Sequence, residues 1–168
     1  IARLKVAAAC HVTLEGTPII FYGTEVGLSQ YDDAHKENSY ARPPMLWGEQ
    51  QDKDLLAYYR LLLQLRRERP ALRYGERITL PADTIKLSEA TREQVGAYVR
   101  QWQEESLLIV LNNSEQEAKL SILLGEVAGY KTITTLRNLL DVNEGREVYV
   151  KDGLLEMTLP AMTAAILA

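Results

Sequence analysis

The segment Glu15–Leu28, with the sequence EGTPIIFYGTEVGL, decides how the rest of the chain is interpreted. Residues 19–22 are β-branched or aromatic with no polar alternation, which is typical of a strand buried on both faces of a parallel sheet. Thr17 and Pro18 end a preceding helix and begin extended chain. Two glycines and the carboxylate of Glu25 follow. The segment therefore predicts a buried parallel strand that ends in a sharp turn.

A helix is predicted on either side of this strand. Residues 1–15 are apolar on more than one face, which favours a helix that packs within a larger assembly. Residues 52–72, DKDLLAYYRLLLQLRRERPAL, place leucines and tyrosines at helical spacing. Asp52 suits the positive amino end of that helix, and Pro70 closes it. The arginines at positions 66, 67 and 69 are expected to form a solvated helix end.

The remainder of the chain changes to short strands. Segments with β-branched residues and frequent alternation lie at 95–103, 106–114, 116–124, 130–138, 146–152, 154–160 and 162–168. Turn sequences such as NNS, DVNEG and KDG separate them. Short strands at regular spacing with such turns predict an antiparallel sandwich or barrel.

Composition limits the class of protein. Hydrophobic residues make up 46% and charged residues 25% of the 168 residues, as in ordinary globular proteins. A net charge of −4 and a pI near 5.3 provide no basic surface, so nucleic acid is not an expected partner. No apolar run approaches the roughly 20 residues of a membrane span, so a membrane is not expected either. The single cysteine forms no internal disulfide, and the cellular location stays open. Because an initiator methionine is absent, we expect a start inside a longer protein.

Several motifs, taken in order, resemble the alpha-amylase family of glycoside hydrolases. GTPIIFYGTEVGLS is similar to the last barrel strand and the loop after it, and Arg42–Trp47, RPPMLW, resembles an element of the same loop. LLAYYRLLLQLRRERPALRYG is similar to the last barrel helix. SLLIVLNNS and LPAMTAAIL resemble strands of the family's C-terminal sandwich. The resemblance implies an α+β fragment: residues 1–72 as the last β/α units of a (β/α)8 TIM barrel and residues 73–168 as an antiparallel β-sandwich.

The resemblance also implies a function. Members of the family act on α-glucosidic bonds in starch-like glucans, oligosaccharides or trehalose-related sugars, by hydrolysis or by transfer. Hydrolysis requires two carboxyl groups, and in the family these come from barrel strands upstream of the part that this chain resembles. We therefore expect no catalytic residue here and no activity of the fragment alone. Active sites of such barrels lie in the loops after the strands, which makes Tyr22, Glu25 and Arg42 the candidate substrate-binding residues.

Each candidate has a structural alternative. Glu25 either contacts sugar hydroxyls or braces the loop, and bracing is favoured. Arg42 either reaches a carboxylate or a distal sugar or packs under the loop. Tyr22 either stacks on a glucose ring or packs. The acidic residues of the loop, Asp32 and its neighbours at 33 and 37, are expected to be solvated and not a metal site, although calcium is possible in a full-length parent.

Two further expectations concern an alternative function and self-association of the fragment. A non-catalytic carbohydrate-binding or interaction module with an amylase-like fold is the alternative function. The first 70 residues distinguish the two, because a free-standing module does not need a doubly buried parallel strand. A lone parallel strand leaves both edges unsatisfied, so the amino-terminal part of the fragment is expected to rearrange or to self-associate.

Overall fold

The computed structural model describes residues 1–29, 43–125, 127, 130, 133–141 and 147–168. Its helices lie in the first half of the chain: α1 (Ala2–Thr13), the 3-10 turns η1 (Thr24–Val26) and η3 (Gly48–Gln50), α2 (Lys53–Glu68) and α3 (Pro70–Tyr74). Strands follow: β1 (Glu76–Thr79), β2 (Ile85–Leu87), β3 (Val95–Trp102), β4 (Glu105–Asn112), β5 (Ala118–Leu123), β6 (Thr135–Arg137), β7 (Glu147–Lys151), β8 (Leu154–Leu159) and β9 (Thr163–Leu167). Six of the seven predicted strand segments contain one of these strands, and the seventh, 106–114, matches β4 except that β4 begins one residue earlier, at Glu105.

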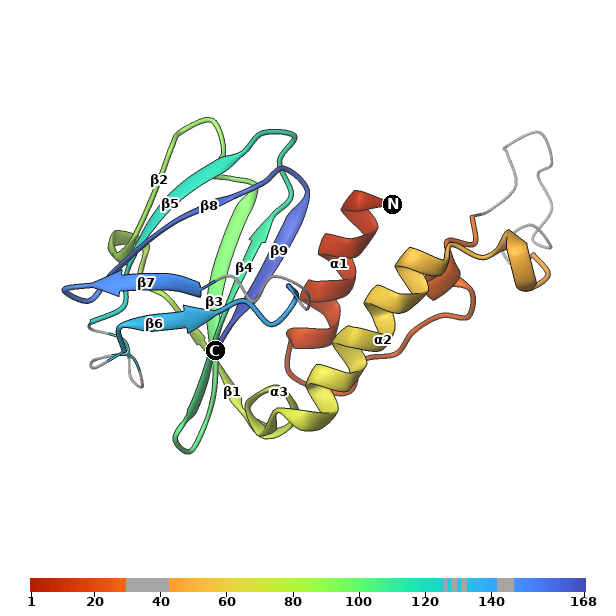
Figure 1. Ribbon diagram of the computed structural model, residues 1–168, viewed down its shortest axis with the longest axis horizontal. Coiled ribbons are helices and arrows are strands. Elements are labelled where there is room, and N and C mark those ends of the chain that lie inside the picture. Colours follow the sequence, from red (N-terminus) through yellow and green to blue (C-terminus); the bar gives the residue numbers. More distant parts are fainter. Residues whose placement is uncertain (30–42, 126, 128–129, 131–132, 142–146) are drawn as a thin grey trace.

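The strands form two sheets that face each other (Figure 1). One sheet has the order β1-β3-β4-β9 and the other the order β2-β5-β8-β7-β6, and all neighbours are antiparallel. Leu108 and Val110 of β4 lie in the core between the sheets with Leu120 and Ile122 of β5 and Leu155 of β8. The predicted antiparallel sandwich is confirmed.

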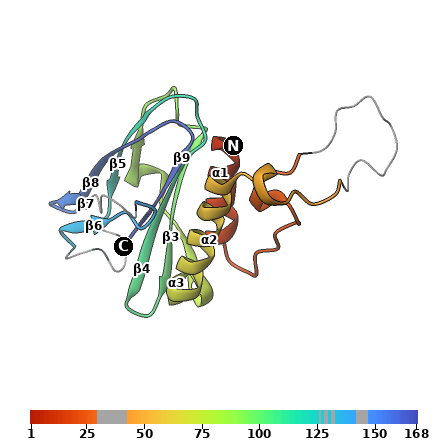
Figure 2. The same cartoon turned by 45° about the vertical axis from the view of Figure 1, so that its right-hand side comes forward.

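The helices cover the outer face of the four-stranded sheet (Figures 1 and 2). Leu107 and Ile109 alternate along β4 with the residues of the sandwich core, so they point to the opposite face. There they pack with Val12 of α1 and with Leu55 and Leu62 of α2. A strand buried on both faces thus joins the helices and the sandwich into one packed body.

The two ends of α2 follow the sequence prediction. The Asp52 side chain accepts a hydrogen bond of 2.8 Å from the backbone N–H of Leu55, which satisfies one of the free donors at the start of the helix. The helix ends at Glu68, and Pro70 begins the short helix α3, as expected for a residue that cannot continue the preceding hydrogen-bond pattern. Both predicted boundaries are confirmed.

The expected strand at residues 19–22 is wrong for this chain. Residues 17–21 form neither helix nor strand and have no strand partner within the described residues. Ile19 is 82% exposed and Phe21 is 58% exposed, so the segment is not buried on two faces. A parallel strand forms only beside neighbours that supply its hydrogen-bond partners, and the described sheets contain antiparallel pairs. The segment does not join the sandwich, and the described residues do not form a barrel.

The carboxyl end of α1 is held by two arginines. Arg66 of α2, expected to be solvated, instead donates to the carbonyls of Val12, Leu14 and Gly16, the second at 2.9 Å. Arg100 of β3, which is 1% exposed, donates to the carbonyl of Thr13 at 2.5 Å. The last carbonyls of a helix lack partners within the helix and carry partial negative charge. The two guanidinium groups therefore cap α1 and connect it to α2 and to the sheet.

In the part of the chain that the structure describes, no helix is long and apolar enough to cross a bilayer.

Asn112, the last residue of β4, connects the turn before β5 with the end of β8 at one end of the sandwich. Its side-chain nitrogen donates to the carbonyls of Gln116 at 2.9 Å, Leu159 at 3.1 Å and Pro160 at 2.9 Å. Its side-chain oxygen accepts from the backbone N–H of Ser114 at 2.9 Å and from the Ser114 hydroxyl at 2.7 Å. The amide is fully buried, so its removal leaves several buried groups without partners.

We predict that Asn112→Ala lowers the free energy of unfolding by about 2–4 kcal/mol, because buried polar groups lose their partners. Urea denaturation followed by tryptophan fluorescence measures this loss. The matched control is Asn113→Ala at the exposed neighbouring position, for which the change is expected within about 0.5 kcal/mol. Equal losses for the two variants would contradict the assignment of Asn112 as a connecting residue.

Candidate functional site

The turn after Tyr22 has the sharp geometry that the sequence predicts. Gly23 and Gly27 flank the 3-10 turn η1 with φ of 84° and 79°, a region that favours glycine. A Cβ at Gly23 would collide with the side chain of Leu28, whose N–H donates to the Gly23 carbonyl at 2.9 Å. The N–H of Asp52 donates to the Val26 carbonyl at 3.1 Å. The turn is thereby fixed to the start of α2.

Tyr22 connects the segments on the two sides of the long loop. Its hydroxyl donates to the carbonyl of Pro43 at 2.9 Å. The ring lies 4.8 Å from that of Phe21 between centroids and is 41% exposed. The hydroxyl therefore braces the chain, while part of the ring stays accessible.

Glu25 and Tyr22 lie at the same hollow. This hollow has a volume of about 280 Å³ and is lined by Ile20, Tyr22, Glu25, Leu56, Tyr59, Arg60 and Leu63. Glu25 Oε2 is buried and has no hydrogen-bond partner among the described residues. Burial raises the pKa of Tyr59, and the nearby charge of Glu25 raises that pKa further. Two of the three predicted binding residues are thus brought together, and the bracing role of Glu25 stays a prediction.

The third candidate, Arg42, lies outside the described residues, as do Asp32, Asp33 and Glu37. Trp47, just beyond this stretch, is 71% exposed. Where the structure describes the chain, no three His, Cys, Asp or Glu side chains are grouped so that they hold a metal ion. The possible calcium of a full-length parent therefore stays a prediction.

Helix α2 supplies wall residues that the motif analysis did not select. Leu56, Arg60 and Leu63 follow one another at spacings of four and three, so they lie on one face of the helix. Arg60 is exposed, which leaves a positive charge at the border of a hollow that contains a carboxylate. The helical spacing was visible in the sequence, but the position of this face opposite Glu25 depends on the tertiary fold.

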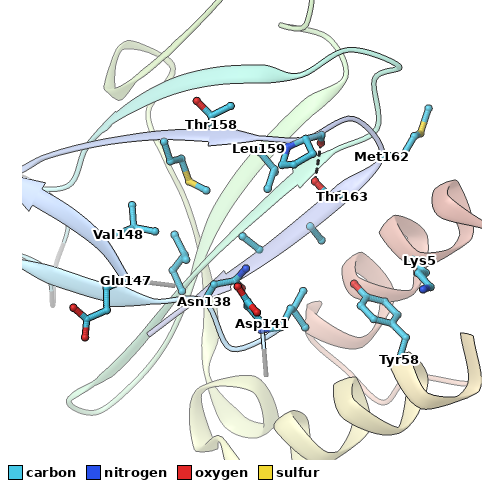
Figure 3. A pocket seen from close by; sticks show the side chains of 16 residues that line it. Lys5, Tyr58, Asn138, Asp141, Glu147, Val148, Thr158, Leu159, Met162 and Thr163 are labelled. Carbon is cyan, nitrogen blue, oxygen red and sulfur yellow. Dashed lines mark hydrogen bonds between the residues drawn. The ribbon is translucent and has the colours of Figure 1, made fainter. Parts of the chain in front are cut away.

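A larger groove of about 630 Å³ lies beside the packed layers, lined by one residue each of α1 and α2 and otherwise by the sandwich, mainly β8 and β9 (Figure 3). Lys5 and Tyr58 lie on the helical side, with Lys5 Nζ 5.6 Å from the centre of the Tyr58 ring. Asn138 and Asp141 lie across from them. Burial raises the pKa of Tyr58 to about 12. None of the predicted binding residues that the structure describes lines this groove, which no sequence motif indicated.

The chain matches a known family and known proteins. Residues 85–166 match the family model of the maltogenic amylase C-terminal domain. A cyclomaltodextrinase of Thermoanaerobacter pseudethanolicus is 34% identical over 141 residues, which are 83% of this chain and 22% of that protein. Neopullulanase 2 of Thermoactinomyces vulgaris is 29% identical over 167 residues, which are 99% of this chain and 25% of that protein.

Solved structures agree with these matches. The crystal structure of an Anoxybacillus alpha-amylase is 29% identical, with a TM-score of 0.73, and the match covers 99% of this chain and 32% of that one. A cyclomaltodextrinase structure is 25% identical, with a TM-score of 0.75, and the match covers 99% of this chain and 26% of that one. The chain spans between about a fifth and a quarter of the length of the curated relatives it matches. By sequence and by fold, the chain belongs to the alpha-amylase family, in which it corresponds to a C-terminal portion of the enzyme.

Proposed function

We propose that the chain is the C-terminal part of an enzyme that hydrolyses or transfers α-glucosidic bonds in cyclomaltodextrins and related maltooligosaccharides. The observation that carries this proposal is the similarity to two cyclomaltodextrinases, at 34% and 36% identity over 83% and 80% of the chain. Their names favour cyclic and short glucans over trehalose-related sugars within the broader class.

The proposed division of the chain places residues 1–72 at the end of the catalytic barrel and residues 73–168 in the sandwich. The exposure of Ile19 and Phe21 supports it, because these apolar side chains lie away from the sandwich core and are left for neighbours that a barrel would supply. In this arrangement the sandwich covers one side of α1 and α2, and the barrel covers the other.

The chain alone is proposed to be inactive. Glycoside hydrolysis uses a pair of carboxyl groups, one as the acid and one as the nucleophile or base. Of the described residues at the hollow beside Tyr22, Glu25 alone carries a carboxylate. We assign to Tyr22, Glu25 and Arg42 the role of substrate contacts in an active site whose catalytic carboxylates come from upstream. We assign no cofactor to these residues, and calcium stays a prediction for the full-length parent alone.

Binding of glucan without hydrolysis is a second candidate function. The larger groove supports it, because Tyr58 presents an aromatic ring in a space of about 630 Å³. This groove is distinct from the hollow at Glu25. The two candidate functions therefore predict that substitutions at different residues weaken glucan binding.

We predict that the intact protein releases reducing sugar from a cyclomaltodextrin and that residues 1–168 alone release none. A colorimetric assay of reducing ends on both proteins measures this. Activity of the isolated chain would refute the proposal that the catalytic carboxylates come from upstream. Binding of maltooligosaccharide by an intact protein that releases no sugar, with a loss of binding in Tyr58→Ala and not in Tyr22→Ala, would establish the second candidate instead.

We also predict that the isolated chain self-associates through its uncovered apolar segment. Light scattering after size exclusion is expected to show a mass above the 19.0 kDa of one chain. Ile19→Ser together with Phe21→Ser reduces the exposed apolar surface and is expected to shift the chain toward the monomer. A wild-type chain that elutes as a monomer at all concentrations would contradict this prediction.

Glu25→Gln is predicted to lower the pKa of Tyr59 toward its ordinary value. Burial is the larger cause of the raised pKa, so some elevation remains after the charge is removed. A raised pKa in the folded state contributes stability that is complete below the ordinary tyrosine pKa of about 10 and is lost as pH rises through the folded value. Glu25→Gln therefore ionises Tyr59 at lower pH and reduces the alkaline loss of stability.

Ultraviolet absorbance of tyrosinate during an alkaline titration measures this shift. The difference between the wild type and Tyr59→Phe isolates the contribution of Tyr59 and is compared with the same difference in the Glu25→Gln background. An unchanged Tyr59 titration would show that the carboxylate does not act on the ring.

A further inference from the structure

The segment between α1 and the glycine turn is fixed mainly at its two ends. Residues 17–21 have no strand partner within the described residues. At the far end, the Tyr22 hydroxyl donates to the Pro43 carbonyl. At the near end, Arg66 donates to the carbonyls of Leu14 and Gly16. These two attachments, together with the packing of Ile20 against the apolar core of the helices, set the course of the segment toward the hollow at Glu25.

Helix α2 carries both the near attachment and a wall of the hollow. Arg66 lies one turn beyond Leu63, so the two side chains are neighbours on the helix surface. Arg60 and Leu63 line the hollow, and Arg66 holds the chain that leads into it. Helix α2 thus fixes the start of the segment 17–21 at a set distance along the helix from the side chains that line the hollow.

The chemistry of the attachment requires an arginine. The carbonyls of residues 12, 14 and 16 lie at and just after the end of α1, and one guanidinium donates to all three of them. A guanidinium offers five donors in a planar fork, whereas an ammonium is a compact charge with three donors around one atom. Lysine at position 66 keeps the positive charge but cannot reproduce this set of contacts.

We propose that Arg66 is a positioning residue for the site at Tyr22 and Glu25. It fixes the exit of α1 and thereby the place of the Tyr22 ring relative to the wall of α2. The proposal rests on the function proposed above, in which this hollow contacts the glucan. Arg66 itself touches backbone and not substrate.

The test uses the intact protein with Arg66→Lys and, as a matched control, Arg67→Lys. Arg67 is exposed on the same helix, and the substitution is the same. In Arg66→Lys, hydrogen exchange is expected to accelerate in peptides that cover residues 14–28 and to stay unchanged in β3 and β4. KM for a cyclomaltodextrin is expected to rise about tenfold while kcat changes less than about threefold, as for a lost contribution to substrate binding away from the reacting bond. Arg67→Lys is expected to match the wild type in both measurements.

A second variant keeps the proposal testable if Arg66→Lys does not fold. Gly16 has φ of +84° with open space around it, so Gly16→Ala disturbs the backbone at the attachment without a collision. It is expected to give the same local exchange and the same rise in KM. Local loosening with raised KM in either variant supports the proposal. Behaviour equal to that of Arg67→Lys, or faster exchange throughout the sandwich, overturns it.

The test distinguishes failure of the proposed function from failure of the positioning role of Arg66. If the wild-type intact protein does not act on glucans, that function fails, while the exchange comparison still shows whether Arg66 fixes residues 14–28. If the wild type is active and both arginine variants have equal KM and equal exchange, the positioning role fails alone.

Discussion

Burial of strand β4 on both faces is the constraint on which the rest of this structure depends. Leu108 and Val110 lie in the core of the sandwich, and Leu107 and Ile109 lie under the helices. Side chains that alternate along one strand thus contribute to two separate apolar cores. The helices and the sheets share this strand, so neither layer can move without opening one of the two cores.

The sequence predicted the elements whose signals are local. Alternating apolar residues indicated β3 to β9, Asp52 indicated the start of α2, and Pro70 indicated its end. The short strands β1 and β2 were not predicted, because four and three residues carry too little periodicity by themselves, whereas the three residues of β6 lie within a longer strand-like segment.

The errors concern features that depend on distant partners. Residues 19–22 have the composition of a buried strand, but composition does not supply neighbouring strands, and the segment has no strand partner in the part of the chain that the structure describes. Arg66 is expected in solvent because arginines commonly end helices, but its carbonyl partners lie 50 to 54 positions earlier in the chain. At the site, the turn and the nearness of Tyr22 to Glu25 followed from the motif, whereas the wall from α2 required the tertiary fold.

The buried guanidinium of Arg100 has a consequence for how the helices settle on the sheet. Apolar contacts are nearly indifferent to small rotations, since burial depends on area and not on direction. Hydrogen bonds from Arg100 to the carbonyls of Thr13, Leu72 and Gly75 require fixed directions. A helix layer shifted by one turn would leave this charge without acceptors in a place that water does not reach, at a cost of several kcal/mol. Arg100 therefore favours one alignment of the helices on the sheet over other alignments that would bury a similar apolar area.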